Sequence, residues 1–244
     1  MNADENRCQF PEPGPRIIVA IDGPAGAGKS TIARQLARHF GLLNLETGAM
    51  YRAFALKALR AGLALDESGG LEALAAETSI RLEPGEEENR VLLDGEDVTG
   101  LIRNPTVTEG ASHVSVFPGI RAWMVSLQQQ LGAQGGVVME GRDIGTVVFP
   151  HAEVKIFLDA APEVRGQRRY DQLGGPSSKA APPPEEIIRD LRARDERDRN
   201  RADSPLKPAA DSVLLDSTKL TLDEAVAAAV SIVADKLRSA GLAS

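Results

Sequence analysis

Short, nearly continuous apolar runs alternate along this chain with longer segments of helical periodicity. The runs are RIIVAID from Arg16, GVVME from Gly136, VKIFLDA from Val154 and VLLDS from Val213. Such runs are typical of strands that are covered on both faces, as in a parallel sheet. Between them, apolar residues recur every three or four positions, for example in PGIRAWMVSLQQQL from Pro118. The alternation predicts an α/β fold with a doubly wound parallel sheet.

Two segments interrupt the alternation. Residues 65–105 are acidic and rich in turn residues, with the strand-like pieces SIRLE and RVLLDGEDV on either side of PGEEEN, and they predict a small β-containing insertion. Residues 173–184 read LGGPSSKAAPPP, which predicts an exposed, mobile loop between two Arg-bearing helices. We therefore expect a disordered tail of residues 1–15 and one domain of residues 16–244.

The composition is that of an ordinary globular domain and restricts its partners. Of 244 residues, 42% are hydrophobic and 26% charged, which is enough to bury a core. A net charge of -7 argues against general binding of nucleic acid or an anionic membrane. No apolar run approaches the roughly 20 residues of a membrane span, and no signal peptide is recognisable, so we expect a cytoplasmic protein. The single cysteine, Cys8, receives no function.

The stretch IDGPAGAGKST joins the first predicted strand to a helix and satisfies the pattern G-x-x-x-x-G-K-[ST]. In such a loop the backbone N–H groups and the helix N-terminus surround phosphate oxygens, and Lys29 neutralises the terminal phosphates. Ser30 is placed to ligate Mg²⁺. A plain glycine-rich turn with a surface lysine would explain none of this spacing. The predicted residues for ATP, or another nucleoside triphosphate, are Gly23, Pro24, Ala25, Gly26, Ala27, Gly28, Lys29, Ser30 and Thr31.

Polar residues near two further predicted elements indicate a second anionic ligand. ETGAMYR places Thr47 at a predicted helix N-cap and Arg52 about one and a half turns further along. Arg142 and Asp143 directly follow a predicted strand, at the edge where ligands of open α/β sheets bind. Because a triphosphate site alone suits a switch, a motor or a kinase, these residues are needed to choose among them.

A charged run near the end of the chain, RARDERDRNRADSPL, adds a third group of arginines. Arg194, Asp198 and Arg201 are spaced by four and three residues and share a helix face, whereas we expect Arg197 and Arg199 to point elsewhere. A solvated helix with internal ion pairs is the alternative. A nucleic-acid patch is disfavoured because acidic residues are interleaved with the basic ones.

Several motifs, in order over nearly the entire chain after the tail, resemble the bacterial cytidylate kinase family. They are DGPAGAGKST, TGAMYR, FPGIR, EGRDIGTVVFP with KIFLDA, RDERDRNRADSPLKPAAD and LLDST. The resemblance implies a P-loop nucleoside monophosphate kinase that transfers the γ-phosphoryl group of ATP to CMP or dCMP. We expect a monomer, although the sequence does not fix the oligomeric state. It implies that residues 65–105 are a monophosphate-binding insertion and residues 165–185 a lid. Kinases of UMP, AMP or a hydroxylated metabolite, and a regulatory ATPase switch, are the alternatives.

The resemblance also implies roles for individual residues. The acceptor phosphate would contact Arg52, Arg142 and Arg201; the cytosine Ser112, Arg121 and Asp143; the ribose region Arg194 and Asp198; and Thr47 and Tyr51 would line the pocket. Lys29, Arg142, Arg194 and Arg201 are the expected catalytic residues. Arg165, Arg168 and Arg169 are either lid residues that reach the transferred group or a solvated helix face. The chain departs from the family pattern at Glu46-Thr47, where Asp-Ser is expected, and in its Pro- and Ala-rich lid loop.

Overall fold

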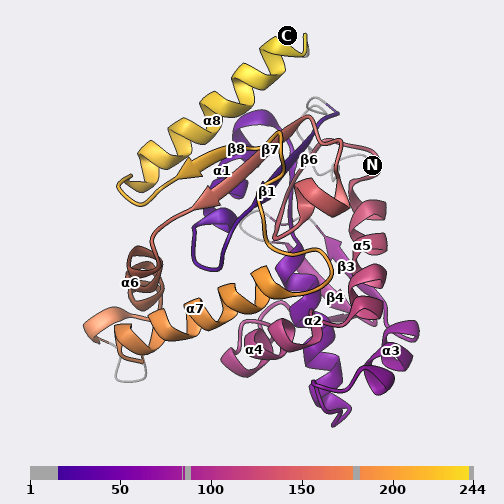
Figure 1. Cartoon of the computed structure of the whole chain (residues 1–244). Helices are drawn as coiled ribbons and strands as arrows, with labels where there is room; N and C mark the ends of the chain where they lie inside the picture. The colour runs from indigo at the N-terminus through magenta and orange to yellow at the C-terminus, as the bar shows by residue number, and fades with distance from the viewer. Residues whose placement is uncertain (1–15, 84, 86–88, 178–181, 242–244) are drawn as a thin grey trace, which may run out of the picture.

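A five-stranded parallel sheet forms the centre of the protein (Figure 1). The computed structural model describes residues 16–83, 85, 89–177 and 182–241, so the predicted tail and part of the lid loop lie outside the described residues. The strand order is β2-β6-β1-β7-β8, and every pair is parallel. The strands are β1 (Ile18–Asp22), β2 (Leu43–Glu46), β6 (Val137–Gly141), β7 (Val154–Asp159) and β8 (Val213–Asp216). The predicted doubly wound sheet is confirmed.

Helices cover both faces of this sheet, which explains why its strands are apolar at consecutive positions. On one face, Val19 and Ile21 pack with α1 (Lys29–Phe40) and α8 (Leu222–Ser239). On the other face, Ala20 belongs to the core formed by α2, α4 and α5. These helices are α2 (Thr47–Arg60), α4 (Pro105–Val114) and α5 (Pro118–Gly132). Successive residues of one strand therefore serve two separate cores.

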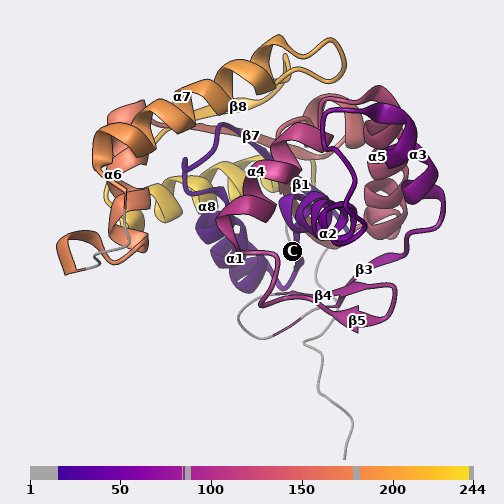
Figure 2. The same ribbon diagram turned by 90° about the horizontal axis from the view of Figure 1, so that it is seen from below.

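The segment predicted as a β-containing insertion forms a small sheet of its own (Figure 2). After α3 (Ser68–Ala76), the antiparallel strands β3 (Ile80–Glu83), β4 (Arg90–Leu93) and β5 (Glu96–Asp97) pair in the order β3-β4-β5. Asp94 and Gly95 have φ angles of 50° and 90°, as a two-residue hairpin turn requires. The predicted strands are therefore confirmed, and the binding role of the segment stays a prediction.

Two helices form an arm beside the carboxyl ends of the central strands (Figure 1). They are α6 (Pro162–Gln172) and α7 (Pro184–Asn200), joined through the short η2 (Gly175–Ser177) and by residues 178–181, which lie outside the described part. A π-helical turn, η1 (Ile144–Val148), follows β6. In the described part of the chain, no helix is both long and apolar enough to cross a lipid bilayer.

Candidate active site

The glycine loop between β1 and α1 has the conformation that its sequence pattern predicts. At Gly23, whose φ is 149°, a Cβ atom would lie 1.9 Å from the carbonyl oxygen of Leu158, so only glycine fits. Gly28 caps α1 in the left-handed conformation with φ of 97°, and no side chain caps this helix end. The first N–H groups of α1 are consequently left to a ligand, and a helix N-terminus of this kind favours an anion.

Lys29 lies inside this loop, where it is only 7% exposed. Its Nζ donates a hydrogen bond to the carbonyl oxygen of Pro24 at 2.7 Å. Burial and the positive charge of Arg142 lower the pKa of Lys29 to about 7, although the carboxylate of Glu140 opposes the shift. The influence of Arg142 on this pKa indicates that Arg142 lies near the loop lysine.

Glu140, near the end of β6, and Ser30 could together hold a metal ion. Glu140 is 4% exposed, and burial with the nearby Glu46 raises its pKa to about 7. The side chain of Ser30 hydrogen-bonds to Glu140. The Oε1 atom of Glu140 has no hydrogen-bond partner among the described residues. Within those residues no three His, Cys, Asp or Glu are grouped to hold a metal. Magnesium at phosphate sites takes most of its ligands from water and phosphates, so two protein oxygens suffice.

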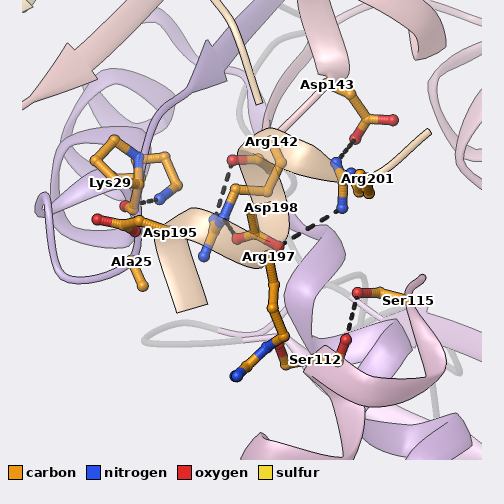
Figure 3. A network of polar contacts seen from close by, with 12 residues as sticks. Ala25, Lys29, Ser112, Ser115, Arg142, Asp143, Asp195, Arg197, Asp198 and Arg201 are labelled. Carbon is orange, nitrogen blue, oxygen red and sulfur yellow. Dashed lines mark hydrogen bonds and ion pairs between the residues drawn. The ribbon is translucent and has the colours of Figure 1, made fainter. Parts of the chain in front are cut away.

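Asp143 and Asp198 hold three arginines, Arg121, Arg142 and Arg201, in place (Figure 3 labels both aspartates, Arg142 and Arg201). Arg142 donates from Nε to Asp198 at 2.9 Å, and Arg201 lies 3.7 Å from the other oxygen of Asp198. Asp143 accepts a short hydrogen bond from Arg121 and lies 3.9 Å from NH2 of Arg201. The predicted residues from three distant segments are thereby brought together.

The arginines keep unused donors after these pairings. NH2 of Arg201 and Nε of Arg121 are buried without a hydrogen-bond partner among the described residues, and so is Nε of Arg194. Burial, followed by repulsion from Arg142, lowers the pKa of Arg194 to about 10, which leaves it charged at neutral pH. Buried cations with free donors are a binding site for an anion.

The start of α2 differs from the prediction in one respect. Thr47 is the first residue of the helix, and Glu46 is its N-cap residue without a side-chain bond to the helix, so the prediction that Thr47 is the N-cap was wrong by one residue. The hydroxyl of Thr47 instead donates to the carbonyl oxygen of Glu140 at 2.7 Å. Glu46, longer than the aspartate expected there, pairs with Arg52 at 2.5 Å. The guanidinium carbon of Arg121 lies over the ring of Tyr51, 6.0 Å from the ring centroid.

Arg197 contacts a predicted site residue, a contact that the sequence reasoning missed. Its Nε donates to the hydroxyl of Ser112 at 3.4 Å, so the expectation that it points elsewhere was wrong (Figure 3). The spacing contained the signal, because Arg197 is three residues after Arg194 and four before Arg201. The long, exposed side chain of Arg197 extends from α7 to Ser112 on α4.

The arginines of α6 lie in three different environments. Arg165 is 2% exposed: it donates to the carbonyl oxygens of Ala160 and Ala25 at 2.8 Å each and pairs with Asp195 at 2.7 Å, so a solvated face is wrong for this residue. Arg168 donates to both Ser217 oxygens, at 3.1 and 2.9 Å, and to Ala27 at 3.4 Å. Arg169 contacts Gln172 on its own helix.

A narrow cleft separates α1 from the small sheet. Ser30, Glu46 and Arg52 line it from the central domain, and Asn89 and Arg103 line it from the opposite side. Arg103 contributes to the lowered pKa of Glu46, behind the larger effect of Arg52. The cleft therefore places a cation of the insertion near the residues of the glycine loop.

Comparisons with known proteins agree with this geometry. A family model described as cytidylate kinase matches residues 19–235. The cytidylate kinase of Solibacter usitatus (strain Ellin6076) is 50% identical over 225 residues, which cover 91% of this chain and 94% of that protein. The cytidylate kinase of Pasteurella multocida (strain Pm70) is 44% identical over 222 residues, or 91% and 97% of the two chains.

A more distant likeness concerns the fold alone. A crystal structure of a gluconokinase from Sinorhizobium meliloti 1021 superposes with a TM-score of 0.50 at 14% identity, covering 94% of this chain and 98% of that one. The match to the family model, together with relatives near half identity over almost their whole length, identifies the family. The chain belongs to the cytidylate kinase family.

Proposed function

We propose that this protein transfers the γ-phosphoryl group of ATP to CMP or dCMP, yielding ADP and CDP or dCDP. The observation that carries the proposal is the group of buried arginines around Asp143 and Asp198, which lies close enough to Lys29 to lower its pKa. A nucleotide switch has no second phosphate to hold, whereas a kinase of monophosphates needs such a group. Family membership supports the same reaction.

The chemistry needs positioning and charge neutralisation rather than a base. A phosphate acceptor is already a competent nucleophile near neutral pH, and transfer requires that two polyanions be held in line. Lys29 would serve the donor, and Arg52, Arg142 and Arg201 the acceptor phosphate. Mg²⁺, when bound with ATP through Ser30 and Glu140, would neutralise charge on the β- and γ-phosphates. His39 and His151 are exposed and His113 faces Glu109, which fits a reaction without a histidine base.

The remaining acceptor residues would read the nucleoside. Asp143 offers carboxylate oxygens, Arg121 offers N–H donors and Ser112 a hydroxyl, so the three can meet both donors and acceptors of cytosine. Arg194 and Asp198 would hold the ribose region. Arg168, which spans the glycine loop and Ser217, would lie beside the donor nucleotide.

We assign two segments of the chain to the substrates. Residues 65–105 would act as the monophosphate-binding insertion, because the cleft beneath them brings Arg103 toward Glu46 and Arg52. Residues 165–185 would act as the lid over the donor. Closure of such parts excludes water from the transfer and completes the site.

An acceptor screen tests the proposed function. We expect ADP formation to depend on the added monophosphate, with CMP and dCMP far better than UMP or AMP at equal concentration, since Ser112, Arg121 and Asp143 offer both donors and acceptors to cytosine. A coupled assay of ADP release measures each acceptor in turn. ADP formation indifferent to CMP would indicate an ATPase, and preference for another acceptor would reject the assignment to cytosine.

Binding of Mg-ATP should change the protonation of the site with opposite signs on either side of neutrality. Near pH 8 Lys29, with its pKa lowered by burial and Arg142 to about 7, is largely neutral, and a polyanion beside it will draw a proton from the buffer. Near pH 6 Glu140, with its pKa raised to about 7, is largely protonated and will release a proton to the buffer when a cation binds beside it. Calorimetry in buffers of different ionisation enthalpy measures both.

A variant separates the two titrations. Glu140→Gln should abolish the release near pH 6 and preserve the uptake near pH 8, because it removes one titrating group and leaves Lys29 in place. Proton uptake at both pH values in the unmodified protein would contradict the roles given to these two residues.

A further inference from the structure

Asp22, the last residue of β1, is a buried carboxylate that the proposed reaction does not use. It is 4% exposed and directly precedes Gly23, where the glycine loop begins. Its Oδ1 accepts the N–H of Ile144 at 2.7 Å, and its Oδ2 accepts the N–H of Gly145 at 2.8 Å. Both oxygens are thus bonded to the backbone of a segment more than a hundred residues away in the chain.

That segment carries two residues of the acceptor site. Arg142 and Asp143 immediately precede Ile144, and they pair with Asp198 and Arg121 respectively. From Ile144 the backbone forms the π-helical turn η1, a rare geometry that is frequently found at functional sites. Asp22 therefore binds the loop that presents the acceptor residues and is itself covalently joined to the loop that binds the donor.

The carboxylate is kept at this position at a cost in stability. Burial, followed by the negative charge of Asp143, raises the pKa of Asp22 to about 6, even though two backbone N–H groups favour the charged form. Because the pKa is higher in the folded chain, the contribution of the protonated group is present at low pH and is lost as the pH rises through about 6. A group charged at neutral pH under these conditions is more readily explained by function than by stability.

We propose that Asp22 is a positioning residue that fixes the acceptor loop, residues 142–145, against the glycine loop. In this role it sets the KM for the monophosphate and the rate of transfer, and it does not determine the affinity for ATP. The inference rests on the proposed function of the same site.

The substitution Asp22→Asn tests the role with little change in volume. An amide keeps one acceptor oxygen and places an NH₂ group against the second N–H, so one of the two bonds is replaced by a repulsive contact. A displacement of about 1 Å at a reacting group can reduce a rate about a hundredfold. We expect kcat/KM for CMP to fall about a hundredfold through both constants, while the Kd of a non-hydrolysable ATP analogue changes less than about threefold.

The chain offers a matched control at the other end of the same strand. Glu153 is an exposed carboxylate whose Oε2 accepts the N–H of Ile18, the first residue of β1, at 2.8 Å. Glu153→Gln weakens the same kind of bond without touching the acceptor loop. Its kinetics should match those of the unmodified protein, and thermal melting of both variants gives the folded fraction for normalisation.

A second variant approaches the same contact from the loop. In Gly145→Ala the added Cβ would lie 3.4 Å from Oδ2 of Asp22 and 3.2 Å from the side chain of Lys155, so the loop or that side chain must give way slightly while Asp22 is unchanged. We expect the same selective loss for CMP, smaller in size. The variant also keeps the test decisive if Asp22→Asn does not fold.

Two results would overturn the proposal. One is an equal loss of affinity for ATP and CMP in Asp22→Asn, which would assign the residue to the glycine loop. The other is unchanged kinetics in folded protein. Failure of the unmodified protein to form ADP in response to CMP would reject the proposed function instead, so the two failures are distinguishable.

Discussion

Replacing Lys29 by alanine should reduce turnover with ATP and CMP by at least about a hundredfold, because a single preorganised charge contact at a transferring group has effects of this size. The lysine is buried in the loop, and its Nζ donates a hydrogen bond to the carbonyl oxygen of Pro24. Its side chain is therefore already ordered and loses little conformational entropy when it contacts a phosphate. Its removal also deletes a buried charge that the free protein holds at a lowered pKa, and the fold should therefore survive. Steady-state kinetics and thermal melting measure the two effects separately.

A lysine far from the loop serves as the control. Lys236→Ala, in the last turn of α8, removes a lysine outside the glycine loop and should leave turnover unchanged. Turnover of folded Lys29→Ala protein close to that of the unmodified chain would show that the glycine loop is not the donor site.

Replacing Asp198 by alanine should lower kcat/KM for CMP about a hundredfold and alter the KM for ATP far less. The reason has two parts. Asp198 is proposed to hold the ribose region, and it also pairs with Arg142 and Arg201, so its loss releases the two arginines that would grip the acceptor phosphate. Removal of one member of a buried charged group leaves the others without compensation.

Titration of each substrate at saturating concentrations of the other measures this selectivity. Glu196→Ala provides the control, since it removes an exposed carboxylate from the same helix α7 and from its other side. Equal changes in the two KM values of Asp198→Ala would argue against a place for Asp198 on the acceptor side.

The parts of the molecule that could be predicted from sequence are those fixed by local rules. The glycine loop follows from spacing and from backbone angles that only glycine adopts, as at Gly23. Four of the five central strands follow from nearly continuous apolar runs, whereas β2, with the sequence LNLE, has no such run and was not predicted. The residues of the acceptor site could be predicted in part. Helical spacing places Arg194, Asp198 and Arg201 on one face, and the family resemblance supplied the other residues.

What the sequence did not disclose depends on partners far along the chain. In the sequence, Arg165 looks like one member of a charged helix face. In the structure it is buried and donates a hydrogen bond to the carbonyl oxygen of Ala25, 140 residues away. Asp22 reads as the end of a strand, and its role depends on N–H groups 122 and 123 residues away. The N-cap at Thr47 was misplaced for a similar reason, because a carbonyl of a neighbouring strand takes the hydroxyl that would have capped the helix.

The contacts of Arg165 limit how the protein can close around its substrates. One guanidinium bridges the carbonyl of Ala25 and the carboxylate of Asp195, so the base of the arm is clamped to the loop that surrounds ATP. A hinge at this point would have to break a buried ion pair, which disfavours movement of the base of the arm relative to the glycine loop. The base of the arm should therefore move with the glycine loop as one rigid unit when nucleotides bind.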